Sequence, residues 1–224
     1  YYMGHAYKTP SQNLEIRQCY MESGHGAVTI GSEMAGGVKN LHVSKCIFSN
    51  TDRGLRVKTR RGRGKDAVVE GICFEDISMD HVRTPFVVNS YYNCCDPDAH
   101  SDYVKCKTPL PVDDRTPAVN QLTFRNITCT NCHAAGAFLY GLPEQKIDCI
   151  EFDHVSVDYA AEALPMEPAM MDDLGEKARM GLYVNNAKKL ILNQVSIRGN
   201  EGEAFDLHNI DSLILDGEER GEIR

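Results

Sequence analysis

The chain has 224 residues, of which 42% are hydrophobic and 25% are charged, and these proportions are typical of a globular protein with its own core. No apolar run approaches the ~18 residues of a membrane span, so neither a membrane segment nor a disordered chain is expected. The 24 basic and 32 acidic residues give a net charge of −8, which disfavours a general nucleic-acid or anionic-membrane surface.

One short pattern recurs along the whole chain, which is the signature of a repeat architecture. Each copy is an alternating run rich in β-branched and aromatic residues, and such a run predicts a half-buried strand. The copies are NLEIRQCYM from Asn13, NLHVSKCIF from Asn40, GICFEDISM from Gly71, QLTFRNITC from Gln121, CIEFDHVSV from Cys149, KLILNQVSI from Lys189 and SLILDG from Ser212. A second short apolar strand follows most copies, at GAVTIG from Gly26, GLRVKT from Gly54, PFVVNS from Pro85, GAFLYG from Gly136, GLYVNN from Gly181 and AFDLHN from Ala204.

Two strands per repeat, with no helical periodicity between them, indicate an all-β solenoid whose coils must stack to bury their apolar faces. We expect a right-handed parallel β-helix of about seven coils, forming a single domain over residues 1–224. Equivalent positions of successive coils should lie about 4.8 Å apart. The spacing then places Val43 over Ile16, Cys46 over Cys19 and Ile47 over Tyr20.

Surplus residues should leave the solenoid as loops, with insertions expected near 93–117 and 160–179. Long loops on a rigid scaffold usually shape a binding face, although a disordered excursion is the alternative. The polar ending DGEERGEIR is expected either to cap the last coil or to leave it.

The nine cysteines are scattered, and their odd number leaves at least one thiol unpaired. Cys129 and Cys132 form a single C-x-x-C pair, without a second pair at the spacing of a zinc site. The pattern favours packed core thiols. We therefore expect no metal and no cofactor.

The segment Arg53–Lys65 carries seven basic residues in thirteen positions and no acidic one. Strand alternation directs Leu55 and Val57 to the core and projects Arg56 and Lys58 side by side from the surface. Arginine offers a bidentate fork and lysine a point charge, which suits a carboxylate-bearing ligand. A solvated charge run and a nucleic-acid patch are the alternatives, but no recognition helix or aromatic platform accompanies the run.

His25 lies between Gly24 and Gly26, in the turn one coil below Arg56 and Lys58. The flanking glycines allow a tight backbone path that leaves the imidazole exposed. A lone surface histidine is usually incidental, but its place beside the two cations favours a role at the same site.

Four segments taken together resemble the polygalacturonases of glycoside hydrolase family 28, particularly the bacterial exo-acting branch. Gly24-His25-Gly26 corresponds to the family's G-H-G motif, Arg56 and Lys58 fall on its R-I-K motif with Val57 between them, and Tyr92 matches a substrate-binding tyrosine one coil later. The segments are SGHGAVTIGSEMAGGVKN, NTDRGLRVKTRRGRG, FVVNSYYNCCDPD and NCHAAGAFLYGLPEQKI.

The resemblance implies a pectin-lyase-like β-helix that hydrolyses α-1,4 linkages between galacturonic acid units with inversion. The implied partner is polygalacturonate or an oligogalacturonide, with no nucleic acid and no membrane. In this interpretation Arg56 and Lys58 pair with a substrate carboxylate, Tyr92 packs against a sugar ring, and His25 tunes the protonation of the catalytic acid.

Inverting glycosidases need one carboxylic acid and one carboxylate. The family draws them from N-T-D and D-D motifs that precede G-H-G, and we interpret the similar motifs of this chain as look-alikes because all of them follow it. The look-alikes are Asn50-Thr51-Asp52, Asp113-Asp114 and Asp172-Asp173. We therefore expect a carboxy-terminal part that lacks the amino-terminal coils, with an unpaired strand edge on its first coil and no hydrolysis of its own.

Two other functions keep the same fold. One is a non-catalytic galacturonan-binding β-helix, and the other is a related enzyme, either a rhamnogalacturonan hydrolase or a pectate lyase. A calcium-dependent lyase is disfavoured because the sequence has no clear acidic calcium cluster. The opening YYMGHAYKTP has no apolar signal core, and the sequence does not distinguish a secreted or periplasmic protein from a bacterial cytoplasmic one.

Overall fold

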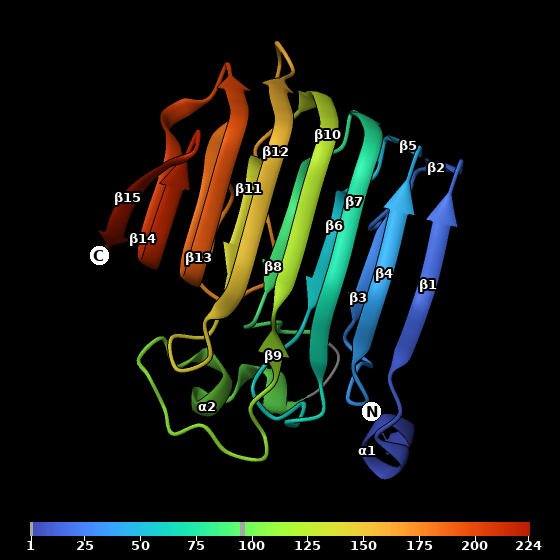
Figure 1. Ribbon diagram of the computed structural model, residues 1–224, viewed down its shortest axis with the longest axis vertical. Coiled ribbons are helices and arrows are strands. Elements are labelled where there is room, and N and C mark those ends of the chain that lie inside the picture. Colours follow the sequence, from blue (N-terminus) through green and yellow to red (C-terminus); the bar gives the residue numbers. More distant parts are fainter. Residues whose placement is uncertain (1, 95–96) are drawn as a thin grey trace.

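The computed structural model describes residues 2–94 and 97–224, so Cys95 and Asp96 of the expected 93–117 insertion lie outside the described residues. The chain forms a right-handed parallel β-helix, as the repeats predicted (Figure 1). Its elements are α1 (Tyr2–Tyr7), β1 (Ser11–Arg17), β2 (Tyr20–Glu22), β3 (Val28–Gly31), β4 (Val38–Ser44), β5 (Ile47–Ser49), β6 (Arg53–Lys58), β7 (Val68–Asp80), β8 (Thr84–Asn89), a 3-10 helix (Pro97–His100), α2 (Asp102–Lys105), β9 (Ala118–Val119), β10 (Gln121–Cys132), β11 (Ala135–Tyr140), β12 (Ile147–Tyr159), β13 (Met180–Arg198), β14 (Glu201–Leu215) and β15 (Glu218–Ile223). Neither α-helix in this part of the chain has the length and apolar character needed to cross a membrane.

Two long parallel sheets form the walls of the β-helix. The first runs β1-β4-β7-β10-β12-β13, and the second runs β3-β6-β8-β11-β13. They meet in β13, where the second strand of one coil continues directly into the first strand of the next. Figure 1 shows the coils side by side from β1 at one end to β15 at the other. Residues one coil apart in the sequence are therefore spatial neighbours.

The register agrees with the sequence prediction. Val43 pairs with Ile16 and Ile47 pairs with Tyr20 across parallel strands. The last strand, β15, turns back and pairs antiparallel with β14, so the polar ending caps the last coil. The cap covers the backbone edge that β14 would otherwise present to solvent.

One backbone feature repeats at equivalent positions of successive coils, directly after β1 and β4 and within β7, β10, β12 and β13. In six successive coils a non-glycine residue takes a left-handed conformation there, with φ between 51° and 55°. A residue in this conformation interrupts the alternation of inward-facing and outward-facing side chains and bends the strand sharply. The six residues are Gln18, Lys45, Asp76, Asn126, His154 and Gln194.

Stacked phenylalanines fill the interior of the solenoid. The ring centroid of Phe124 lies 4.7 Å from that of Phe152, 6.1 Å from that of Phe74 and 4.6 Å from that of Phe86. All four side chains are fully buried. Because Phe124 contacts rings from both sheets, it joins the two walls of the core.

The cysteines behave mainly as core residues. Cys129 and Cys132 are fully buried free thiols, which confirms the interpretation of the C-x-x-C pair. Burial raises the pKa of the Cys129 thiol, so it stays protonated. Cys94 takes part in a disulfide, while the free thiols confirm that some cysteines are unpaired.

The basic segment Arg53–Lys65 differs from a simple exposed strip, because four of its arginines are buried: Arg53, Arg60, Arg61 and Arg63. Arg61 is 1% exposed and forms a bidentate ion pair with Glu144 at 2.6 and 2.9 Å. It also donates to the backbone carbonyls of Tyr103 and Cys106 at 3.2 and 2.6 Å. Arg61 therefore anchors the 93–117 insertion to the solenoid, and its charge serves the fold.

Truncating Phe124 to alanine should lower the free energy of unfolding by about 3–5 kcal/mol, because the cavity lies between the two sheets and cannot collapse easily. Urea denaturation followed by far-ultraviolet circular dichroism measures the change. A loss below about 1 kcal/mol would mean that the stacked rings do not hold the sheets together.

Replacing Glu144 with alanine should cost about 3–5 kcal/mol, since it leaves the buried Arg61 guanidinium without its counterion. The double variant Arg61→Met/Glu144→Leu should recover only part of this loss, because an apolar pair avoids burying charge but leaves the carbonyls of Tyr103 and Cys106 without their donor. The matched control is Asp114→Ala, which removes the exposed ion pair with Lys65 and should change stability little. Equal effects of the two single changes would contradict the anchoring role of Arg61.

Candidate functional site

The second sheet presents the predicted site residues on its outward face. Thr29 pairs with Arg56 and Gly31 pairs with Lys58, as the coil spacing predicted. The strand alternation in β6 is also confirmed, because Leu55 and Val57 are fully buried while Arg56 and Lys58 are half-buried. The structure thus places both cations next to the turn that carries His25.

His25 is held by a carboxylate from the next coil. Its Nδ1 lies 2.7 Å from Oδ2 of Asp52, and the other oxygen of Asp52 lies 3.1 Å from Nη1 of Arg83. An ionised carboxylate can only accept, so Nδ1 of His25 donates to it, and in the neutral imidazole this leaves Nε2 as an acceptor. The His25 side chain is 88% exposed, so Nε2 is accessible to a ligand.

The contact between His25 and Asp52 is not among the sequence predictions, which interpret Asp52 only as part of a look-alike motif. The two residues are 27 positions apart. This is the same offset that places Val43 over Ile16, so the repeat spacing contained the signal.

Arg56 is fixed at both ends of its guanidinium. Nη1 donates to the backbone carbonyl of His25 at 3.3 Å, and Nη2 lies 2.7 Å from the Sδ atom of Met170. Burial lowers the pKa of Arg56, and nearby Tyr92 and Asp52 offset part of that effect. The guanidinium is therefore preorganised, and it faces few competing acceptors.

Lys58 lies over the ring of Tyr92, with its Nζ atom 5.3 Å from the ring centroid. Burial lowers the pKa of Lys58, and the positive charge of Arg56 lowers it further. Tyr92 itself is only 5% exposed. The ring supports the ammonium group by a cation–π contact and offers little open surface for a sugar.

Two glycines allow close contacts at the site, one within the first coil and one between successive coils. A Cβ atom on Gly26 would collide with Oγ1 of Thr29, and one on Gly31 would collide with the carbonyl oxygen of Lys58. Gly31 also has φ near 90°, where side chains are strained. Gly24, on the other side of His25, has φ of 108° and open space around it. The turn path therefore requires glycine at these positions.

The 160–179 insertion packs across the outward face of the second sheet, directly beyond the two cations. Nδ2 of Asn89 donates to the carbonyl of Met170 at 2.7 Å, and the backbone N–H of Asn93 donates to the same oxygen at 3.3 Å. Arg53 donates to the carbonyl of Glu167 at 2.6 Å, and burial lowers its pKa to about 10. These contacts hold the insertion as a fixed wall.

Apolar packing completes this wall. Val87 is the register neighbour of Arg56 on β8, and Phe138 follows on β11. Both point outward, yet they are 2% and 1% exposed because Ala169 and Met171 cover them. The open surface above the sheet therefore ends one coil after Arg56.

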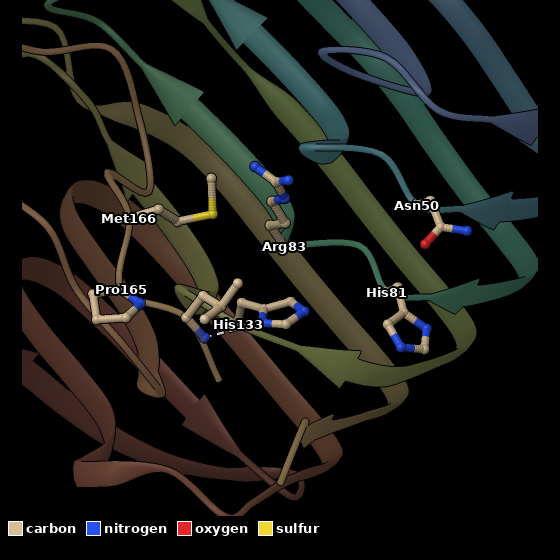
Figure 2. Close-up of a pocket in the computed structure, with 7 residues that line it drawn as sticks. Asn50, His81, Arg83, His133, Pro165 and Met166 are labelled. Carbon is tan, nitrogen blue, oxygen red and sulfur yellow. Dashed lines mark hydrogen bonds between the residues drawn. The ribbon is translucent and has the colours of Figure 1, made fainter. Parts of the chain in front are cut away.

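A pocket of about 240 Å³ lies between one corner of the solenoid, at Asn50, and the part of the wall that includes Pro165 and Met166 (Figure 2). Arg83, which holds Asp52, lines it together with His81 and His133, whose ring centroids are 6.4 Å apart. The backbone N–H of Leu164 donates to Nδ1 of His133 at 3.1 Å. Burial lowers the pKa of His133, and His81 and Arg83 lower it further, so the His133 ring favours the neutral form.

Three of the four remaining look-alike carboxylates, those of Asp113, Asp114 and Asp172, are engaged elsewhere. Asp113 pairs with Arg115 at 2.6 Å and Asp114 pairs with Lys65 at 2.8 Å, both on the insertion near α2. Asp172 lies within 3.3 Å of Lys105. These partners lower the pKa of each carboxyl, so all three are ionised counterions of loop residues.

Comparison with curated proteins finds polygalacturonases. The chain is 28% identical over 161 residues to a probable polygalacturonase of Vitis vinifera, covering 71% of this chain and 30% of that protein. It is 33% identical over 105 residues to an exopolygalacturonase of Arabidopsis thaliana, covering 45% of this chain and 21% of that protein. The chain therefore spans less than a third of the length of either relative.

Two solved structures share the fold. A hyperthermoactive exopolygalacturonase from Thermotoga maritima superposes with a TM-score of 0.55 at 20% identity, over 98% of this chain and 38% of that one. A family 28 exopolygalacturonase from Yersinia enterocolitica gives a TM-score of 0.56 at 16% identity, over 86% of this chain and 30% of that one.

The family assignment rests on a match between this sequence and a family model. The model of the glycosyl hydrolases family 28 matches residues 6–168, a range that includes the His25 turn and both outward cations and ends within the 160–179 insertion. The chain belongs to glycosyl hydrolase family 28.

Proposed function

We propose that this chain binds polygalacturonate or its oligosaccharides on the outward face of β6, with Arg56 and Lys58 as a clamp for one uronate carboxylate. In the whole protein, this site would serve inverting hydrolysis of α-1,4-galacturonosyl linkages. Support comes from the family membership and from the names of the relatives.

The observation that carries the proposal is the pair of preorganised cations. Within residues 2–94 and 97–224, neither Arg56 nor Lys58 forms an ion pair, although the protein carries many more acidic than basic groups. Both are half-buried, and burial lowers the pKa of each. A ligand carboxylate would restore the favourable interaction that burial removes, which is the physical basis for selecting an acidic sugar.

His25 would act next to this clamp. Its position is set by Asp52, which Arg83 holds in turn. The acceptor Nε2 can bind a sugar hydroxyl or a protonated carboxyl, and such a contact influences how neighbouring carboxylates share protons. Gly24 and Gly26 would contribute by keeping side chains away from the same space.

Exo action is the finer part of the proposal. Met170 and its neighbours end the open surface directly after Arg56, so a long polymer cannot continue along the sheet in that direction. A cleft closed at one side favours attack at a chain end over attack in the middle. The two structural neighbours are both named exopolygalacturonases.

A binding function without catalysis is the second candidate. It is favoured by the engagement of Asp113, Asp114 and Asp172 with basic loop residues, which leaves them unsuited to serve as the acid and the base. The two candidates share the clamp and differ in bond cleavage.

Calorimetric titration of the 224-residue chain with trigalacturonate should show binding, and Lys58→Met should weaken it about tenfold, since a charge-assisted contact is lost. The matched control is Lys65→Met, which removes an exposed lysine of the same basic segment that pairs with Asp114, and it should leave affinity unchanged. Equal affinity of Lys58→Met and the unaltered chain would rule out the clamp. A reducing-sugar assay on polygalacturonate should detect no release; turnover would assign a catalytic role to one of the look-alike carboxylates.

The affinity for trigalacturonate should also fall at alkaline pH. Because the pKa of Lys58 is lowered in the folded protein, its charge is lost at a lower pH than that of an exposed lysine, and affinity should fall as pH rises through that value. Arginine stays charged over the same range, so Lys58→Arg should move the fall to higher pH. Titrations from roughly pH 7 to 11 measure this. An identical pH profile for the two proteins would show that Lys58 does not set it.

A further inference from the structure

A second group of chemically active side chains lies on the outward face of the first sheet, away from the clamp. His42 is on β4, and Cys73 and Glu75 are two residues apart on β7. Parallel pairing puts His42 directly opposite Cys73, and Ser44 opposite Glu75. Since alternate residues share a face, all three side chains project from the same side of the sheet.

The three potential ligand atoms are close together. Nε2 of His42 lies 3.0 Å from Oε1 of Glu75, and these atoms and the sulfur of Cys73 all lie within 4.8 Å of one another. Ligand atoms of a tetrahedral ion are a little over 3 Å apart when the bonds are about 2.0–2.3 Å long. Small side-chain rotations would therefore bring the three atoms to bonding distance of one ion.

The neighbouring charges leave this group available. Arg125 is the register neighbour of Glu75 on β10, but its guanidinium bonds to Glu151 at 3.0 and 3.2 Å. Glu75 therefore keeps His42, at 3.0 Å, as its partner. Cys73 is a half-buried free thiol, and burial raises its pKa, with the charge of Glu75 adding to the effect. A bound cation would reverse this effect and stabilise the thiolate.

We propose that His42, Cys73 and Glu75 form a binding site for one zinc ion, with a water molecule as the fourth ligand. A thiolate, an imidazole and a carboxylate are a donor set that suits Zn²⁺ better than the oxygen-seeking Mg²⁺ or Ca²⁺. The site differs from the C-x-x-C pair, whose thiols are buried in the core. It was not expected from the sequence, because its ligands come from two separate coils.

Zinc at this position would join β4 to β7 across adjacent coils. An ion that binds the folded chain more tightly than the unfolded chain raises the melting temperature, and the rise increases with the logarithm of the ion concentration once the site is saturated. Binding also displaces the thiol proton of Cys73.

The test uses the 224-residue chain with Co²⁺ as a spectroscopic probe for Zn²⁺. One equivalent of Co²⁺ should produce a thiolate-to-cobalt charge-transfer band, and Zn²⁺ should remove it by displacement. Cys73→Ser should abolish the band, and His42→Asn or Glu75→Gln should weaken Zn²⁺ affinity by about tenfold or more. Cys149→Ser is the matched control, because it removes another half-buried thiol of the same sheet and should leave the band intact.

Melting curves without metal establish that each variant is folded, and curves with Zn²⁺ should show a higher melting temperature only where all three ligands remain. A band that survives Cys73→Ser, or Zn²⁺ that fails to shift the melting of the unaltered chain, would overturn the proposal. Trigalacturonate binding is measured separately and should be equal in Cys73→Ser and the unaltered chain, so the zinc site and the proposed sugar clamp can fail independently.

Discussion

The structure depends on one constraint: each coil must hydrogen-bond to the next in register, at a spacing of about 4.8 Å. This stacking converts separation by one repeat in the sequence into contact in space. His25 thereby meets Asp52, and Asp52 meets Arg83. The same rule brings His42 onto Cys73 on the other sheet. Left-handed residues at equivalent corners keep the coils similar in shape, so the register is maintained along the chain.

The basic segment shows how one composition can serve two purposes. Arg56 and Lys58 point outward from β6 and keep partly accessible charges. Arg53 and Arg61 lie on either side of them in the sequence and bind the loops. Arg53 donates to a backbone carbonyl, and Arg61 pairs with Glu144. The buried arginines hold the two insertions in place, and those insertions then define the space around the outward cations. A substitution of Arg53 or Arg61 would therefore alter the shape of the site, although neither residue is proposed to contact the ligand.

The insertions are where sequence reasoning was least complete. Their approximate position was predictable, because they interrupt a regular repeat, but their docking was not. Met170 closes the surface beyond Arg56 through contacts with Asn89 and with the guanidinium itself. Tyr92 was expected to face a sugar, whereas the structure buries its ring under Lys58. Both outcomes depend on nonperiodic contacts between distant segments, and no local pattern encodes them.

The sequence by itself determined the β-helix, the register of its strands and the outward direction of Arg56 and Lys58, because each follows from strand alternation and a repeated spacing. It also determined the resemblance to family 28, through short motifs in a fixed order. Only the tertiary structure decided that Asp52 holds His25, that Arg53 and Arg61 are buried anchors, and that the insertion around Met170 covers the sheet beyond Arg56. The physical reason is that periodicity specifies the backbone of a solenoid, while side-chain partners and loop docking are set by packing across coils.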